Sequence, residues 1–456
     1  MPEGHEGTGT GTGAGTGELE RTLGPVTIWA LGVGYVISGM YFGWNLGLPQ
    51  GGPYGLLLAT ALVTVMYVTF VLGYAELACA LPRAGGAFVY AHAAFGPELG
   101  FLAGVAQCIE FVFAPPAIAA AIGAYVAIFF PAVPALAIAA LAYVLFTGLN
   151  AWGVKQSAVF ELVITILAVV ELLIFAGATA PSFTWAAFSR DPLPNGWLGA
   201  LPAIPFAIWF YLAIEGVANI AEEARDPARD LARGFGLAMA TLVVLALLTF
   251  FCAVGVDGWR TVVYPTADLS KPSDSPLPLA LGKVVGDSHV LYHLLIGIGL
   301  GGLVASFHGI ILVAGRATFE MGRMGYAPAA LGRAHAVRKT PIAALLLNMV
   351  VGLAALATGK TAEIISIAVL GALTLYTISM AALFRLRVTR PDLARPFRTP
   401  LYPLVPGVAL VLALLCLLAT LWYGDWKVAL AYAGLLGSAG VWYAVVVRRG
   451  APHPAA

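Results

Sequence analysis

Two glutamates stand far inside long apolar runs of this chain. Glu110 lies in Gln107-Cys-Ile-Glu-Phe-Val-Phe-Ala-Pro-Pro116, and Glu215 lies in Trp209-Phe-Tyr-Leu-Ala-Ile-Glu-Gly-Val217. A charge at the centre of a membrane helix costs roughly 2.5–3.5 kcal/mol on insertion scales and marks a functional site by default. A carboxylate there can hold an ammonium group, and the prolines after Glu110 free backbone carbonyls that add to this attraction. The alternative for Glu110 is a carboxyl that is protonated or paired with a neighbouring helix.

Two segments predict interrupted helices. Glycines crowd the run from Gly32 to Gly47, and each costs a helix about 1 kcal/mol relative to alanine. Opened backbone at membrane depth is tolerated only where it lines a cavity. We therefore predict two broken helices, one around Ser38-Gly39-Met40 and the other around Ile214-Glu215-Gly216, with the substrate path running past them. For the first segment, close helix packing through Gly39-xxx-Gly43-xxx-Gly47 is the alternative.

Other polar residues in apolar runs fit structural roles. Glu171 and Glu76, in the fifth and second runs, are interpreted as structural. His308 is the only histidine deep in a run. It is either a hydrogen-bonded structural residue or a group that faces substrate or handles protons, because imidazole titrates near physiological pH.

Motifs for other chemistries are missing from the sequence. The four cysteines are scattered through apolar runs, without a paired framework or metal spacing. There is no His-Glu-x-x-His motif, no pair of aspartates and no Gly-x-Ser-x-Gly elbow. We therefore expect neither an enzyme nor a cofactor. The net charge of +1 gives no indication of nucleic acid binding.

The elements that must position these residues are membrane spans. The chain has 456 residues, 60% of them hydrophobic and 10% charged, whereas soluble domains carry about 25% charged residues. Residues 1–20 predict a disordered cytoplasmic tail, and residues 21–450 predict a single transmembrane domain of an all-α membrane protein. Its twelve predicted transmembrane helices fall at about 24–48, 53–80, 100–128, 132–149, 157–180, 199–220, 232–256, 289–315, 341–358, 362–384, 403–423 and 427–447.

The distribution of basic residues predicts the orientation. With twelve spans and both termini cytoplasmic, the inner segments hold 18 of the Lys and Arg residues and the outer segments hold 6. The N-terminus lacks the basic region and short apolar stretch of a cleaved signal peptide. We predict a multi-pass protein of the plasma (cytoplasmic) membrane, present as a monomer or a homodimer.

Four longer motifs, in this order, resemble the amino acid–polyamine–organocation transporter superfamily. They are Glu76-Leu-Ala-Cys-Ala-Leu-Pro-Arg-Ala-Gly-Gly-Ala-Phe88, Ala221-Glu-Glu-Ala-Arg-Asp-Pro-Ala-Arg-Asp230, Gly315-Arg-Ala-Thr-Phe-Glu-Met-Gly-Arg-Met-Gly-Tyr-Ala-Pro328 and Arg395-Pro-Phe-Arg-Thr-Pro-Leu-Tyr-Pro403. The resemblance covers about residues 20–450. It implies alternating access and a leucine-transporter-like 5+5 inverted-repeat fold, with repeats at about 24–180 and 199–385 and two extra C-terminal helices at 403–447. It also implies an aromatic lid, which we carry onto Trp209.

Three shorter segments look like the ethanolamine permease subgroup: Ser38-Gly-Met-Tyr-Phe-Gly-Trp-Asn45, Gly51-Gly-Pro-Tyr-Gly55 and Ser306-Phe-His-Gly-Ile-Ile311. Two positions depart from the superfamily pattern. Ile37 replaces the first glycine of the Gly-Ser/Thr-Gly motif that cradles a substrate carboxylate, which argues for an amine without one. Ala168 stands where some proton-coupled members have a lysine, so that the coupling ion, proton or sodium, stays open.

We predict a permease that imports a small cationic amine, with ethanolamine as the first candidate. The amine binds to residues that line the two breaks, and aromatic side chains among them form cation–π walls. The alternative is an amino acid or polyamine permease or exchanger of the same fold. A receptor or a structural membrane protein would not need two broken helices with buried acids. The predicted substrate-binding residues are Ser38, Gly39, Met40, Tyr41, Gln107, Glu110, Trp209, Phe210, Ile214, Glu215, Gly216 and His308.

Overall fold

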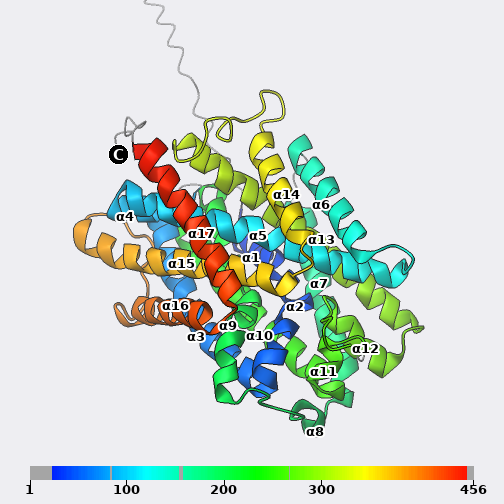
Figure 1. Ribbon diagram of the computed structural model, residues 1–456. Helices are drawn as coiled ribbons and strands as arrows, with labels where there is room; N and C mark the ends of the chain where they lie inside the picture. The colour runs from blue at the N-terminus through cyan, green and yellow to red at the C-terminus, as the bar shows by residue number, and fades with distance from the viewer. Residues whose placement is uncertain (1–22, 83–84, 154–157, 267, 449–456) are drawn as a thin grey trace, which may run out of the picture.

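A computed structural model describes residues 23–82, 85–153, 158–266 and 268–448 (Figure 1). Over these ranges the chain consists of helices and their connections, and its only β feature is an isolated bridge between Leu23 and Ala224. The predicted disordered tail at 1–20 lies outside the described residues. The prediction of an all-helical protein is confirmed for the part that is described.

Ten helical segments of the described chain are long and apolar enough to cross a membrane. They coincide with ten of the twelve predicted spans. The other two predicted spans, 24–48 and 341–358, contain the shorter apolar helices Pro25–Val36 and Ile342–Leu356. The total of twelve spans and the inverted repeat stay predictions.

The spans are built from helices whose bounds are as follows. They are α1 (Pro25–Val36), α2 (Ser38–Tyr41), η1 (Trp44–Gly47), α3 (Leu48–Ala80), α5 (Pro97–Phe129), α6 (Ala135–Trp152), α7 (Ala158–Thr179), α9 (Ala200–Trp209), η4 (Ile214–Glu223), α10 (Ala232–Asp257), α13 (Val290–Arg323), α14 (Ile342–Leu356), α15 (Thr361–Thr389), α16 (Leu404–Tyr423) and α17 (Trp426–Trp442). Shorter helices lie in the connections: α4 (Ala87–Phe95), α8 (Trp185–Phe188), α11 (Trp259–Val263) and α12 (Pro276–Val285).

Helix α5 runs through the centre of the bundle and packs against α4, α6, α13, α14 and α15. Helices α16 and α17 lie at the periphery, with α17 crossing the outside of the bundle in Figure 1. The interrupted segments α1–α2–η1 and α9–η4 are interior, since every residue from Ile37 to Leu48 and from Ala203 to Ala218 is buried. The bundle therefore places both breaks where they are shielded from lipid.

The outward faces of the spans are apolar. Large aliphatic side chains are exposed on α6, α7, α10, α14 and α16, among them Leu141, Leu145, Val163, Leu173, Val244, Val350 and Leu415. Soluble monomers rarely expose large contiguous apolar patches. Exposed tryptophans stand at helix ends, as expected at headgroup depth: Trp152, Trp185, Trp197, Trp422 and Trp426. This surface is suited to a bilayer.

Candidate substrate site

The first interruption lies slightly later than the sequence predicted. Helix α1 ends at Val36, and Ser38–Tyr41 form one further helical turn, α2. The helical geometry is lost at Phe42, which is extended, and at Gly43, whose φ is +89°. Glycine populates this region without a steric penalty, so Gly43 permits the break. The prediction of an unwound Ser38-Gly39-Met40 was therefore wrong by about one turn.

The second interruption is likewise displaced, towards the N-terminus of its span. Helix α9 ends at Trp209, residues 210–213 form turns, and Ile214 begins a 3₁₀ segment. The break lies at Ala213, whose φ of +78° is unusual for a residue with a side chain. Such backbone strain persists only when the surrounding structure holds it, and it clusters at functional sites. Ile214, Glu215 and Gly216 follow the break rather than form it.

The two interruptions touch each other. A Cβ atom at Gly39 would overlap the backbone carbonyl of Trp209, and one at Gly43 would overlap the Trp209 indole. Gly39 thus serves close packing while Gly43 serves the break, so that both interpretations of the glycine-rich run hold at different positions. Trp209 also meets Phe42 edge to face at 5.4 Å.

Glu110 of α5 and Glu215 of η4 come together at the second interruption. The two carboxyl groups interact with each other, and Glu110 also lies beside the backbone of Ala213. Glu110 is fully buried and Glu215 is 3% exposed. Both oxygens of Glu110 and Oε1 of Glu215 lack a well-aligned hydrogen-bond donor among the described residues. Two adjoining carboxyl groups in an apolar interior repel each other unless a proton or a cation lies between them.

Tyrosines form the wall beside this acid pair. The Tyr376 hydroxyl donates to Glu215 Oε2 at 2.8 Å and lies 3.1 Å from the Tyr67 hydroxyl. The Tyr67 ring meets those of Tyr211 and Tyr376 at centroid distances of 5.3 and 5.5 Å. The sequence interpretation missed Tyr67 and Tyr376. Their signal was a tyrosine in an otherwise apolar span, which alone does not show which way the ring points.

Trp209 does not lie directly beside the acid pair but is offset from it along the axis of α15. A Cβ atom at Gly43 would meet both the Trp209 indole and Ile365, which places Trp209 near Ile365 of α15. A Cβ atom at Gly371, also on α15, would lie 2.8 Å from the Glu110 backbone nitrogen, which places Glu110 near Gly371. Ile365 and Gly371 are six residues apart on α15, which corresponds to about 9 Å along the helix axis. The Trp209 Nε1 donor is buried and has no acceptor among the described residues. Such a placement suits the predicted lid, one to two turns from the acids.

Ser38 and Met40 both form hydrogen bonds within the protein. The Ser306 hydroxyl of α13 lies 2.9 Å from Ser38 Oγ and 2.8 Å from the Tyr35 carbonyl oxygen. The Met40 carbonyl oxygen accepts a hydrogen bond from Trp44 Nε1 at 3.1 Å.

The remaining predicted residues lie around the breaks. Phe210 stacks on Trp44 at 5.8 Å, and Gly216 faces the Tyr35 ring. Gln107 is buried one turn before Glu110 on α5.

Tyr41 and His308 face away from the acid pair. The Tyr41 hydroxyl donates to Glu171 Oε2 at 2.7 Å, on the side of the first break opposite Trp209. The His308 ring lies 5.9 Å from the Phe146 ring, and its carbonyl oxygen accepts from Asn150. His308 follows Ser306 by two residues, or about 200° around the helix, so that Ser306 and not His308 faces the junction of α1 and α2.

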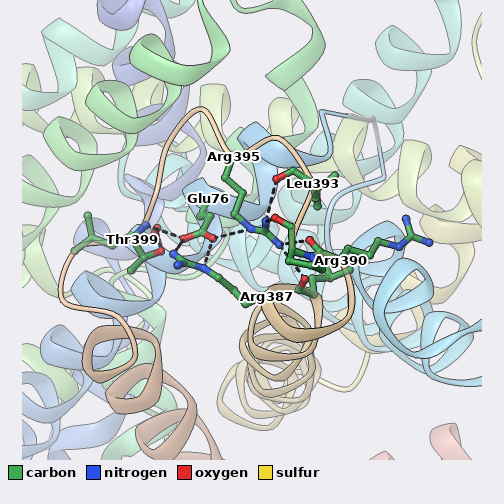
Figure 2. Close-up of polar contacts among 9 residues, drawn as sticks. Glu76, Arg387, Arg390, Leu393, Arg395 and Thr399 are labelled. Atoms are coloured by element: carbon green, nitrogen blue, oxygen red, sulfur yellow. Dashed lines mark hydrogen bonds and ion pairs between the residues drawn. The ribbon is translucent and has the colours of Figure 1, made fainter.

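Glu76 has a structural environment, as the sequence predicted. It is fully buried and accepts two hydrogen bonds from the Arg387 guanidinium, at 2.7 and 2.6 Å (Figure 2). Arg395 lies 3.4 Å away, and the Thr399 backbone N–H donates to Glu76 Oε2 at 2.7 Å. This cluster joins the end of α3 to the end of α15 and to the connection that follows it.

An apolar bundle with two interrupted helices and buried acids between them defines a multi-pass integral membrane protein with an internal polar site. Comparison with known proteins agrees with this class. The model of a family described as amino acid permease matches residues 23–447, and the chain belongs to this family.

Several curated proteins are similar along most of their length. An uncharacterized transporter of Rhizobium meliloti (strain 1021) is 30% identical, over 87% of this chain and 85% of its own. The branched-chain amino acid permease BcaP of Bacillus subtilis (strain 168) is 26% identical, over 89% of both chains. The methylthioribose transporter of the same organism is 26% identical, over 86% of both. These names indicate transporters rather than enzymes.

Proposed function

We propose that this permease imports a small cationic amine, ethanolamine first, by alternating access around the two breaks. The ammonium group binds between Glu110 and Glu215, beside the tyrosines of the site. Trp209 covers it from the side of Ile365. The protein acts in the plasma membrane with both termini cytoplasmic, in line with the 18-to-6 distribution of basic residues.

The observation that carries the proposal is the acid pair itself. Among the ion pairs of the described residues, none involves Glu110 or Glu215. Glu76, by contrast, is buried with two arginines beside it. A buried acid pair without a basic side chain is suited to a ligand that supplies the positive charge.

The first break favours an amine over an α-amino acid. A carboxylate would need free backbone N–H groups there. Those of Ile37 and Met40 already donate to Val33 and Ile37 carbonyl oxygens, and that of Gly43 donates to Asn45 Oδ1. Three of these N–H groups are therefore occupied, in addition to the loss of the first glycine at Ile37.

Uptake by reconstituted protein tests the proposal. Glu110→Gln and Glu215→Gln should each weaken the apparent affinity for ethanolamine about 10- to 100-fold, because a hydrogen bond to a charged group contributes about 1.5–3 kcal/mol and 1.4 kcal/mol is tenfold. Glu363→Gln makes the same chemical change at a partly exposed carboxyl that pairs with Lys360, and should leave uptake unchanged. Normal transport by both site variants would exclude the proposed site.

The second candidate is an amino acid or polyamine permease or exchanger of the same fold. It is favoured by relatives named as a branched-chain amino acid permease and, in Arabidopsis thaliana, as a vacuolar cationic amino acid transporter. Competition separates the two candidates. Displacement of labelled ethanolamine by alanine or arginine, but not by other amino alcohols, would favour the second.

A further inference from the structure

Glu171 of α7 occupies a second buried polar site, on the other side of the first break. Its side chain is 3% exposed. A small cavity beside it is lined by Tyr41, Tyr125 and Glu171 and otherwise by apolar side chains, namely Phe175, Leu277, Pro278, Leu281, Leu295 and Ile296. The polar side-chain groups in this lining are one carboxyl group and two phenol hydroxyls.

We propose that Glu171 is a proton-binding site whose occupancy is linked to the position of α2, the single helical turn between α1 and the first break. The proposal rests on the transport function inferred above, because it names the ion that the cycle exchanges. It does not depend on the identity of the substrate.

The hydrogen bonds of Tyr41 can accommodate either protonation state. Its hydroxyl lies 2.7 Å from Glu171 Oε2 and 3.4 Å from the Ala168 carbonyl oxygen. When Glu171 is ionised, Tyr41 donates its proton to the carboxylate. When Glu171 is protonated, its own O–H donates to the Tyr41 oxygen, and the Tyr41 proton turns to Ala168, since a hydroxyl is both donor and acceptor.

The chain geometry links this hydrogen bond to the break. Tyr41 is the last residue of α2 and is followed directly by extended Phe42 and Gly43. Its ring packs against Gly299 and Gly302 of α13, where a Cβ atom would lie 2.8 and 3.2 Å from it. If α2 moves, Glu171 loses the hydrogen bond that the Tyr41 hydroxyl donates to it. A carboxylate left in an apolar cavity is costly, so movement of α2 favours uptake of a proton.

The surrounding groups favour a proton over a divalent metal cation. Hard divalent cations take about six to eight oxygen ligands, and the apolar lining of this cavity cannot supply them. Among the described residues no cluster of three His, Cys, Asp or Glu side chains occurs that would hold a metal.

Other titratable groups near Glu171 are few. Tyr41 of α2 and Tyr125 of α5 line the cavity, and Tyr292 of α13 interacts with Tyr125. Helix α12 contributes apolar side chains, and its Lys283 and the following Asp287 are exposed. Helices α1 and α10, which also pack against α7, add no side chain to the cavity lining that the structure describes. Glu171 thus supplies the carboxyl group of the cavity lining.

The first experiment needs no substrate. Trp44 donates to the Met40 carbonyl of α2 and therefore reports on this turn. A pH titration of tryptophan fluorescence on the purified full-length protein should show a transition that Glu171→Gln abolishes and that Tyr41→Phe displaces towards alkaline pH. Tyr125→Phe removes a 3.1 Å hydrogen bond to the Tyr41 carbonyl oxygen without removing the Glu171 donor, and should keep the transition. A transition unchanged in Glu171→Gln would overturn the proposal.

The second experiment tests coupling in proteoliposomes with labelled ethanolamine. Glu171→Gln should lose uptake driven by a proton gradient at least tenfold, yet retain exchange at equal pH within about twofold. Gradient-driven uptake that survives in this variant, or exchange lost together with it, overturns the proposal. If the unmodified protein transports no ethanolamine, the proposed substrate fails, whereas the fluorescence titration still decides whether Glu171 binds the proton.

Discussion

Glu76→Gln, at a position outside the candidate substrate site, should strongly destabilise this protein. It removes the negative charge at the centre of the cluster in Figure 2, where Glu76 is fully buried and the Arg395 side chain is only 5% exposed. The amide can accept one hydrogen bond from Arg387, but it no longer balances two guanidinium groups. The cluster is left with buried positive charge that no described acid compensates.

The magnitude follows from burial and geometry. Arg387 binds Glu76 through two parallel hydrogen bonds of 2.7 and 2.6 Å, the strongest arrangement open to this pair. Breaking a buried ion pair by removing one partner costs about 3–5 kcal/mol, because the other charge stays buried. Arg395 moderates the loss, since its guanidinium also donates to the carbonyl oxygens of Leu386, Arg390 and Leu393. We expect about 3 kcal/mol.

The assay is thermal unfolding of detergent-solubilised protein, compared with a matched acid-to-amide change. Asp191→Asn disrupts the Arg260–Asp191 pair, whose side chains are 54% and 40% exposed, and should cost about 0–1 kcal/mol. The double variant Glu76→Gln/Arg387→Met should be less destabilised than the sum of its single changes, because it removes one unpaired charge. Equal, small effects of Glu76→Gln and Asp191→Asn would refute the reasoning.

Three further predictions concern packing, a loop acid and a hydrogen bond. Gly39→Ala should abolish uptake, because its Cβ overlaps the Trp209 carbonyl, whereas Gly236→Ala meets open space and should be tolerated or stabilising by up to about 1 kcal/mol. Burial raises the pKa of Asp274, in the connection before α12, from 3.8 to about 6. Stability should therefore fall as pH rises between these values, by at most about 3 kcal/mol, and Asp274→Asn should flatten this slope in thermal melts. Ser306→Ala should lower stability by about 1 kcal/mol, measured in the same melts, through the lost hydrogen bond to the first broken helix.

The apolar spans and the buried acids could be predicted because their signals are local. An apolar run of about 20 residues indicates a span wherever it packs, and a glutamate inside it has few alternatives to a functional or paired role. The position of a break is harder to predict. Gly39 and Gly43 carry the same local signal and both contact Trp209, and only the backbone geometry shows that Gly39 lies in a helical turn whereas Gly43 has a positive φ.

Partners across the bundle could not be predicted from one sequence. Tyr376 is 161 residues from Glu215, and its hydroxyl meets that acid only because α15 packs along α5 and α9. The hydrogen-bond partner of Glu171 could not be predicted either. The sequence interpretation of this residue was structural, and nothing near it in the chain indicates that Tyr41, 130 residues earlier, supplies its hydrogen bond.

The one-turn helix α2 lies between two acidic sites, and this position gives the molecule a physical basis for coupling. Gly39 and Tyr41 are two residues apart, about 200° around the helix axis. Gly39 contacts the second broken helix at Trp209, the proposed lid of the acid pair, while Tyr41 contacts Glu171 on the opposite side. A displacement of α2 that opens the Trp209 side must therefore disturb the Tyr41–Glu171 hydrogen bond as well. Under the proposed function, movement of Trp209 and a change in the protonation of Glu171 are consequences of one displacement of α2, and no separate element is needed to connect them.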